Sequence, residues 1–169
     1  HVSIKCLDAE LHNTPKLIPE KIREKYLTLK DDFSKVFIAY ADCGTGGLLD
    51  NILKEYDLER LEGAHCYEFY SGQTNFTHFT EQELGTFYLT DFLVKHFERL
   101  VIKGLGMDQH PELKNDYFKH YKKVIYLAQS RSKSLQQDAK KYADFLDLDY
   151  SFYYTGLDSL ESQLNQSVN

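Results

Sequence analysis

Short apolar runs alternate with segments of helical apolar spacing along almost the whole chain, and this order constrains the fold more than any other feature. Most runs are rich in β-branched and aromatic residues, as buried strands are. They lie at 2–7, 36–40, 58–61, 85–90, 124–128 and 149–154. Alternating strands and helices favour parallel strands joined by right-handed crossovers. The sequence therefore predicts an α/β fold with a mainly parallel twisted sheet of about five strands and helices on both faces, a Rossmann-like three-layer arrangement.

Helices are predicted between these runs, at 18–29, 48–56, 92–103, 111–121, 134–146 and 157–164. Thr90 or Asp91 is the expected N-cap of the third helix, and Phe92 and Tyr117 are expected in the core. Residues 67–70 fit either a strand or a helix, and the mixed polar and aromatic residues of 71–84 predict a surface loop.

The chain has 169 residues and no internal repeat or linker, so residues 1–169 are expected to form a single domain. Residues 2–7 already have a strand pattern directly after His1. We therefore expect that the chain is an N-terminally truncated fragment.

Charge and cysteine content narrow the class of partner and the compartment. The net charge is −6, which argues against nucleic acid or an anionic membrane surface as the main partner, because both attract basic proteins. No apolar run approaches the roughly 20 residues of a membrane-spanning helix. Three cysteines are poor material for a disulfide framework, so a reducing compartment is expected, with the cytoplasm as the default.

Polar residues with metal-binding chemistry follow several of the predicted strands. His12 follows the first, Cys43 the second, and His65 and Cys66 the third. The carboxyl ends of parallel strands meet at one edge of the sheet, where ligands of such folds bind. Thiolates and neutral imidazoles are good ligands for zinc, iron or cobalt. The sequence predicts a metal site made of Cys43, His65 and Cys66, with His12 as a further candidate ligand.

Cys43 lies in a glycine-rich turn between a strand and a helix, Asp42-Cys43-Gly44-Thr45-Gly46-Gly47. Such a turn leaves backbone N–H groups unpaired at the positive end of the helix dipole, where an anion or a cofactor edge can bind. Gly44, Thr45, Gly46 and Gly47 are therefore candidate cofactor-binding residues. The turn has neither the third glycine of a dinucleotide fingerprint nor the Gly-Lys-Ser/Thr of a Walker A loop.

The same turn supports an alternative function. A helix N-terminus lowers the pKa of a nearby thiol, so Cys43 could be the catalytic nucleophile of a thiol-dependent enzyme that acts on a small anionic substrate. His65 or His12 would then be the base.

Four motifs of this chain resemble the DUF1638 family of bacterial and archaeal proteins. In chain order they are Leu11-His12-Asn13-Thr14-Pro15, Tyr40-Ala41-Asp42-Cys43-Gly44-Thr45-Gly46-Gly47, Ala64-His65-Cys66 and Gly85-Thr86-Phe87-Tyr88-Leu89-Thr90. The resemblance runs from about residue 2 to residue 156 and implies an α/β fold. Members usually begin with a further strand and helix, so the resemblance implies that this strand–helix unit is missing before His1. Members also have an Asp between the His and the Cys of the third motif, which is absent between His65 and Cys66.

The resemblance also implies a metabolic setting. Genes of family members tend to lie beside corrinoid-dependent methyltransferases of the trimethylamine type and their corrinoid proteins. This association implies an accessory, metal-linked or corrinoid-linked role in methylamine and one-carbon metabolism, and a non-catalytic docking partner of a methyltransferase or corrinoid protein is a further alternative.

Overall fold

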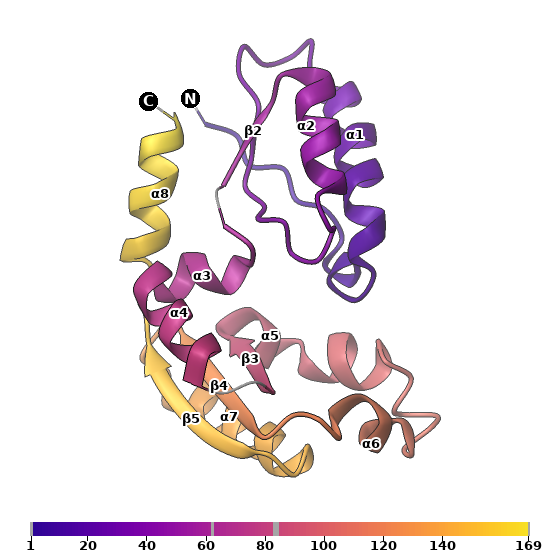
Figure 1. The fold of residues 1–169 in the computed structure, drawn as a ribbon, viewed down its shortest axis with the longest axis vertical. Helices are drawn as coiled ribbons and strands as arrows, with labels where there is room; N and C mark the ends of the chain where they lie inside the picture. Colours follow the sequence, from indigo (N-terminus) through magenta and orange to yellow (C-terminus); the bar gives the residue numbers. More distant parts are fainter. Residues whose placement is uncertain (1, 62, 83–84, 169) are drawn as a thin grey trace. The chain divides into compact units, whose positions relative to one another are not determined.

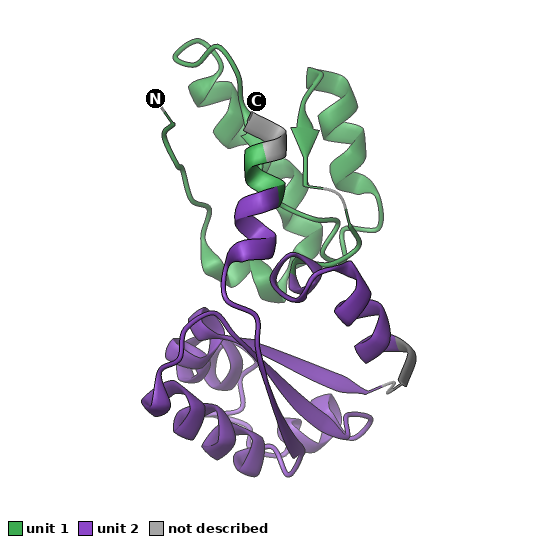
Figure 2. Ribbon diagram, turned by 90° about the vertical axis from the view of Figure 1, so that its left-hand side faces the viewer, with its two compact units in different colours: residues 1–66, 163–169 green, residues 67–162 purple. Residues whose placement is uncertain are grey.

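The computed structural model describes residues 2–61, 63–82 and 85–168. They form two compact units, one of residues 1–66 with 163–169 and one of residues 67–162 (Figure 2). All strands that the structure describes pair in parallel, which confirms the predicted α/β class. The strands described form a two-stranded and a three-stranded sheet, where one sheet of about five was expected. The prediction of a single domain that lacks an N-terminal strand–helix unit stays a prediction.

The first unit contains the parallel pair β1 (Phe37–Ile38) and β2 (Glu59–Arg60), which the helix α2 (Leu48–Tyr56) connects. Figure 1 labels α2 and β2. Before them come two 3₁₀ turns, η1 (Ala9–Asn13) and η2 (Pro15–Leu17), and the helix α1 (Ile18–Leu29). The core of this unit consists of apolar side chains from η1, α1 and α2: Leu11, Ile18, Ile22, Leu49 and Leu53. Both helices follow the apolar spacing in the sequence.

The predicted strand at 2–7 is wrong. These residues form no strand, and Val2 and Ile4 are 69% and 84% exposed. The alternating pattern describes a strand with one buried face, but a strand also needs a neighbour for its backbone N–H and C=O groups. The run predicted at 36–40 forms only the two residues of β1. The sheet nearest in sequence therefore offers residues 2–7 very few backbone partners.

The second unit has the strand order β3 (Thr86–Thr90), β4 (Lys123–Ala128), β5 (Asp149–Tyr154). β4 lies in the middle and is buried from Val124 to Ala128, as its unbroken apolar run predicts. The sheet has helices on both faces. Neighbouring residues of β3 point to opposite faces of the sheet, and their contacts show a helix on each face. Tyr88 packs on Tyr67, whereas Phe87 packs on Phe118.

The helices of the second unit largely follow the prediction. They are α5 (Asp91–Lys95), α6 (Leu113–Phe118), α7 (Lys133–Phe145) and α8 (Asp158–Val168), with a π-helix, η3 (Glu98–Lys103), after α5. α8 continues into the residues assigned to the first unit. The Thr90 hydroxyl accepts a hydrogen bond from the amide of Leu93, which confirms Thr90 as the N-cap of α5. Phe92 and Tyr117, expected in the core, are 50% and 46% exposed because Leu93, Val94 and Phe118 fill the buried faces instead.

Residues 66–82 differ most from the prediction in this unit. Residues 67–70 are helical, in α3 (Cys66–Ser71), and the segment predicted as a surface loop contains the helix α4 (Gln73–Gln82). Its apolar pattern is weak, so the sequence alone gave little sign of a helix. Packing supplies the missing stabilisation, because Phe76 and Phe79 lie on Tyr88 and Tyr153 of the sheet.

No helix in the described part of the chain combines the length and the apolar character needed to cross a membrane.

Candidate metal centre

The backbone pairing of β1 with β2 continues beyond the strands and positions the candidate metal ligands. The amide of Leu61 donates to the carbonyl of Ile38, and farther on the amide of Cys43 donates to the carbonyl of Ala64 at 3.0 Å. Two chain segments therefore run together to the point where each ends in cysteine or histidine. This arrangement is the strand-end juxtaposition predicted from the sequence.

Three side chains converge there. Each of Cys43, His65 and Cys66 offers one ligand atom, and these atoms lie within 4.8 Å of one another. The Cys66 sulfur lies 3.8 Å from Nδ1 of His65. His65 and Cys66 can face the same point although they are adjacent, because Cys66 begins a helix rather than continuing a strand. All three side chains are partly exposed.

The surroundings favour the protonation states that metal binding needs. The hydrogen bond with the Cys66 side chain lowers the pKa of Cys43 to about 7, against an opposing effect of burial. Burial lowers the pKa of His65, and the charge of His12 lowers it further. At neutral pH a large share of Cys43 is thiolate and His65 is mostly neutral, and these are the forms that bind metals.

The backbone of Cys43 has φ of +48°, a left-handed conformation that residues other than glycine rarely adopt. The amide of Cys43 is held in the ladder to Ala64 while the chain turns sharply into Gly44, whose φ is +83°. Backbone strain of this kind is concentrated at functional sites. The turn therefore aims the Cys43 side chain at the cluster at some cost in stability.

The glycine-rich turn after Cys43 already binds an internal anion. The Asp42 carboxylate accepts hydrogen bonds from the Thr45 hydroxyl at 2.5 Å, the Gly47 amide at 2.8 Å and the Gly46 amide at 3.2 Å. These bonds lower the pKa of Asp42. Binding of a cofactor by Gly44, Thr45, Gly46 and Gly47 stays a prediction, and such a ligand would have to compete with Asp42 for two of the amides.

Arg60 supports the loop that carries His65, a role that sequence reasoning missed. Its guanidinium binds Asp50 of α2 at 2.7 Å and donates to the carbonyls of Leu61 and Gly63. Sequence reasoning also missed that Tyr40 lies near the cluster. Its pKa is raised by burial and by the charges of Cys43, Cys66 and Cys6. Arg60 in the third apolar run, at 58–61, was the available signal, because a charged side chain within such a run usually has a partner.

His12 is exposed and lies outside the group of three. Its effect on the pKa of His65 places it near the cluster. The prediction that His12 ligates a metal therefore stays a prediction, and its ligand atoms would have to move closer. Cys6 is exposed and is also outside the group.

The strand ends of the second unit gather a different set of polar groups around Asp91, which is 8% exposed. Its carboxylate accepts hydrogen bonds from the Tyr126 hydroxyl at 2.7 Å, the Gln129 amide at 3.0 Å and the Ser130 hydroxyl at 2.5 Å. The Gln129 side chain in turn accepts from the Asp91 amide at 2.9 Å. These mutual bonds satisfy a buried carboxylate and join the ends of β3 and β4, so the cluster has a structural explanation.

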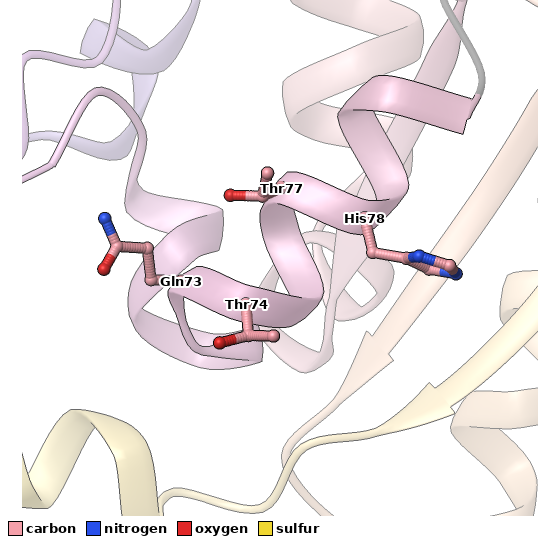
Figure 3. A pocket seen from close by; sticks show the side chains of 4 residues that line it. All are labelled: Gln73, Thr74, Thr77 and His78. Carbon is pink, nitrogen blue, oxygen red and sulfur yellow. The ribbon is translucent and has the colours of Figure 1, made fainter.

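A shallow depression lies along α4, lined by Gln73, Thr74, Thr77 and His78. The four side chains come from one helix and point in different directions (Figure 3). They therefore do not converge on a ligand.

Parallel sheets covered by helices, with a thiolate and imidazole cluster at the strand ends, define an α/β protein with a candidate metal centre. The chain matches the family model described as protein of unknown function (DUF1638) over residues 6–164, and it belongs to that family. The predicted resemblance to this family is thereby confirmed. No curated protein and no solved structure gives a significant match to the chain.

Proposed function

We propose that this protein binds one transition-metal ion through Cys43, His65 and Cys66. The observation that carries the proposal is the convergence of their three ligand atoms within 4.8 Å. Tetrahedral zinc with bonds of about 2.3 Å to sulfur and about 2.0 Å to nitrogen separates neighbouring ligand atoms by roughly 3.5–3.8 Å. Small side-chain adjustments are enough to reach that geometry.

The ligand set selects the class of metal. Two thiolates and one imidazole suit zinc, iron or cobalt, whereas magnesium and calcium prefer oxygen ligands. Zinc is the first candidate because mixed thiolate and imidazole sites are its usual ligand sets. An accessory role in corrinoid-dependent methylamine and one-carbon metabolism is part of the proposal, and it rests on the family resemblance.

Metal analysis tests the proposal. Protein prepared anaerobically, incubated with zinc and freed of excess ion should retain one zinc per chain. Cys43→Ser and Cys66→Ser should each reduce retained zinc at least tenfold, because each removes a thiolate ligand. Cys6→Ser is the matched control and should retain zinc as the unaltered chain does, since Cys6 lies outside the cluster. Equal retention in all four proteins would contradict the proposal.

A second candidate function is thiol chemistry at Cys43, which its pKa of about 7 favours. In this case Cys43 attacks a small anionic substrate and the neutral His65 is the base. The hydrogen bonds from the glycine turn to Asp42 weigh against it, because they occupy two of the amides that would hold the anion.

The pH dependence of Cys43 alkylation tests this alternative. In metal-free protein the rate should be half-maximal near pH 7, against about pH 8.5 in urea-unfolded chain. Cys66→Ser should move the midpoint upward, because it removes the thiol that lowers the pKa of Cys43. Mass spectrometry of the modified peptide gives the rate at this one cysteine. A midpoint of Cys43 alkylation equal to that of the unfolded chain would show that the Cys43 thiol is not activated, and would contradict this second candidate function.

A further inference from the structure

We infer that the metal ion held by Cys43, His65 and Cys66 keeps a fourth coordination position, and that a small thiol from solution binds there as a thiolate. The inference rests on the proposed metal-binding function and names a ligand class for that site. It follows from the number of donors, their exposure and their charge.

The number of donors is three. Among the residues that the structure describes, the group that closes on one point consists of Cys43, His65 and Cys66. Structural zinc sites have four protein ligands, whereas sites that bind a substrate have three and leave a position for water or an incoming ligand. Two thiolates with one imidazole are one of the known three-ligand sets.

The carboxylate whose charge acts on both Cys43 and His65 is that of Asp42, and it is engaged elsewhere. Both oxygens of Asp42 accept hydrogen bonds within the glycine turn, from Thr45, Gly46 and Gly47. His12, whose charge acts on His65, is exposed and lies outside the converging set. The three ligand residues are themselves partly exposed, and the inference takes the fourth position to be the one that faces solution.

The charge of the donor set selects a soft ligand. Two thiolates and a neutral imidazole cancel the charge of a divalent ion, so the ion attracts a hard oxygen ligand less strongly than one held by three imidazoles. Sulfur ligands of high polarisability remain well suited to such an ion. Binding exchanges a metal-bound water for RS⁻, and the proton of the RSH group goes to solvent.

Cobalt-substituted protein provides the test, with 2-mercaptoethanol as the probe under anaerobic conditions. The sulfur-to-cobalt charge-transfer absorbance should rise about 1.5-fold at saturation, because the number of bound thiolates changes from two to three. A pH indicator in weakly buffered solution should report release of one proton per thiol bound. Ethylene glycol, the oxygen analogue, should change neither signal, and Cys6→Ser should respond as the unaltered chain does.

The outcomes separate this inference from the proposed function. Absence of the two-thiolate cobalt spectrum before thiol is added would overturn the proposed function. A normal cobalt spectrum that 2-mercaptoethanol does not change would overturn the inference alone, and a response restored by His12→Ala would identify His12 as the fourth ligand. Cobalt that leaves the protein during gel filtration with the thiol would also overturn the inference, since the thiol would then be removing the metal.

Discussion

At the scale of single residues, Cys43 meets two demands that conflict in most positions. It supplies a sulfur to the cluster, and its backbone takes the left-handed conformation at the start of the glycine turn. Glycine would adopt that conformation without strain. A cysteine at this position therefore supplies a ligand atom and lowers the stability of the fold.

Replacing Cys43 by glycine and by alanine separates these two effects. Neither variant can ligate a metal, but Cys43→Gly relieves the left-handed strain and Cys43→Ala keeps it. We expect the glycine variant to be more stable than the alanine variant by about 1 kcal/mol, after the greater flexibility of glycine in the unfolded chain is included. Urea unfolding of the metal-free proteins measures the difference. An alanine variant as stable as the glycine variant would show that the turn is unstrained.

The predictability of the site also differs residue by residue. Cys43, His65 and Cys66 were predictable because each follows a strand of a parallel pair, and local patterns locate strand ends. His12 was assigned by the same reasoning from a strand at 2–7 that does not form. The supporting role of Arg60 depends on Asp50 and on loop carbonyls, so it arises only when α2 and β2 have packed.

At the scale of elements, the start of β3 depends on one close backbone approach. The carbonyl of Gly85 accepts a hydrogen bond from the amide of Lys122 at 2.8 Å, just before β4. A Cβ atom at Gly85 would lie 2.4 Å from the carbonyl oxygen of His120, and φ of Gly85 is +96°. The first registered pair of the two strands, Thr86 with Lys123, follows directly.

Gly85→Ala should therefore destabilise the second unit by about 2 kcal/mol or more, because a backbone atom must shift to admit the methyl group. Gly106→Ala is the matched control. Gly106 also has positive φ, at +73°, but its nearest neighbour is the flexible Leu113 side chain at 3.7 Å, so about 1 kcal/mol is expected. Denaturant unfolding compares the two, and equal losses would mean that the His120 carbonyl moves without difficulty.

Elements with strong periodicity were predictable, and elements made by packing were not. The long apolar spacing of α1, α2 and α7 and the apolar run of β4 identified them in the sequence. α4 lacks such a pattern and depends on the aromatic contacts of Phe76 and Phe79 with the sheet. The division of the strands into two sheets was also hidden, because parallel pairing joins segments that are distant in sequence.

At the scale of the whole molecule, the metal centre belongs to one unit. Cys43, His65 and Cys66 all lie within residues 1–66, whereas the three-stranded sheet lies within residues 67–162. A ligand that binds only folded protein stabilises the part whose unfolding destroys the site. Its effect should therefore differ between the two units.

Hydrogen exchange with and without zinc measures that difference. At a zinc concentration about one hundred times the dissociation constant, zinc binding raises the free energy of unfolding of the first unit by about 2.7 kcal/mol. Amides that exchange through unfolding of this unit should then exchange about 100-fold more slowly. We expect this slowing for amides of β1, α2 and β2, and little change in β4 and β5. Cys43→Ser should abolish it. Equal slowing in both units would show that they unfold together.

Two segments of the chain bring the ligands together, one leading from β1 to Cys43 and the other from β2 to His65. We call these segments the arms of the centre. Ile38 is in register with Arg60, and counting onward along both segments brings Cys43 level with His65. The arms after the paired strands are therefore of matched length, and they stay matched only if both keep their residue number. An insertion or deletion in one arm displaces a ligand along the chain by a whole residue. The centre therefore depends on the number of residues in these arms.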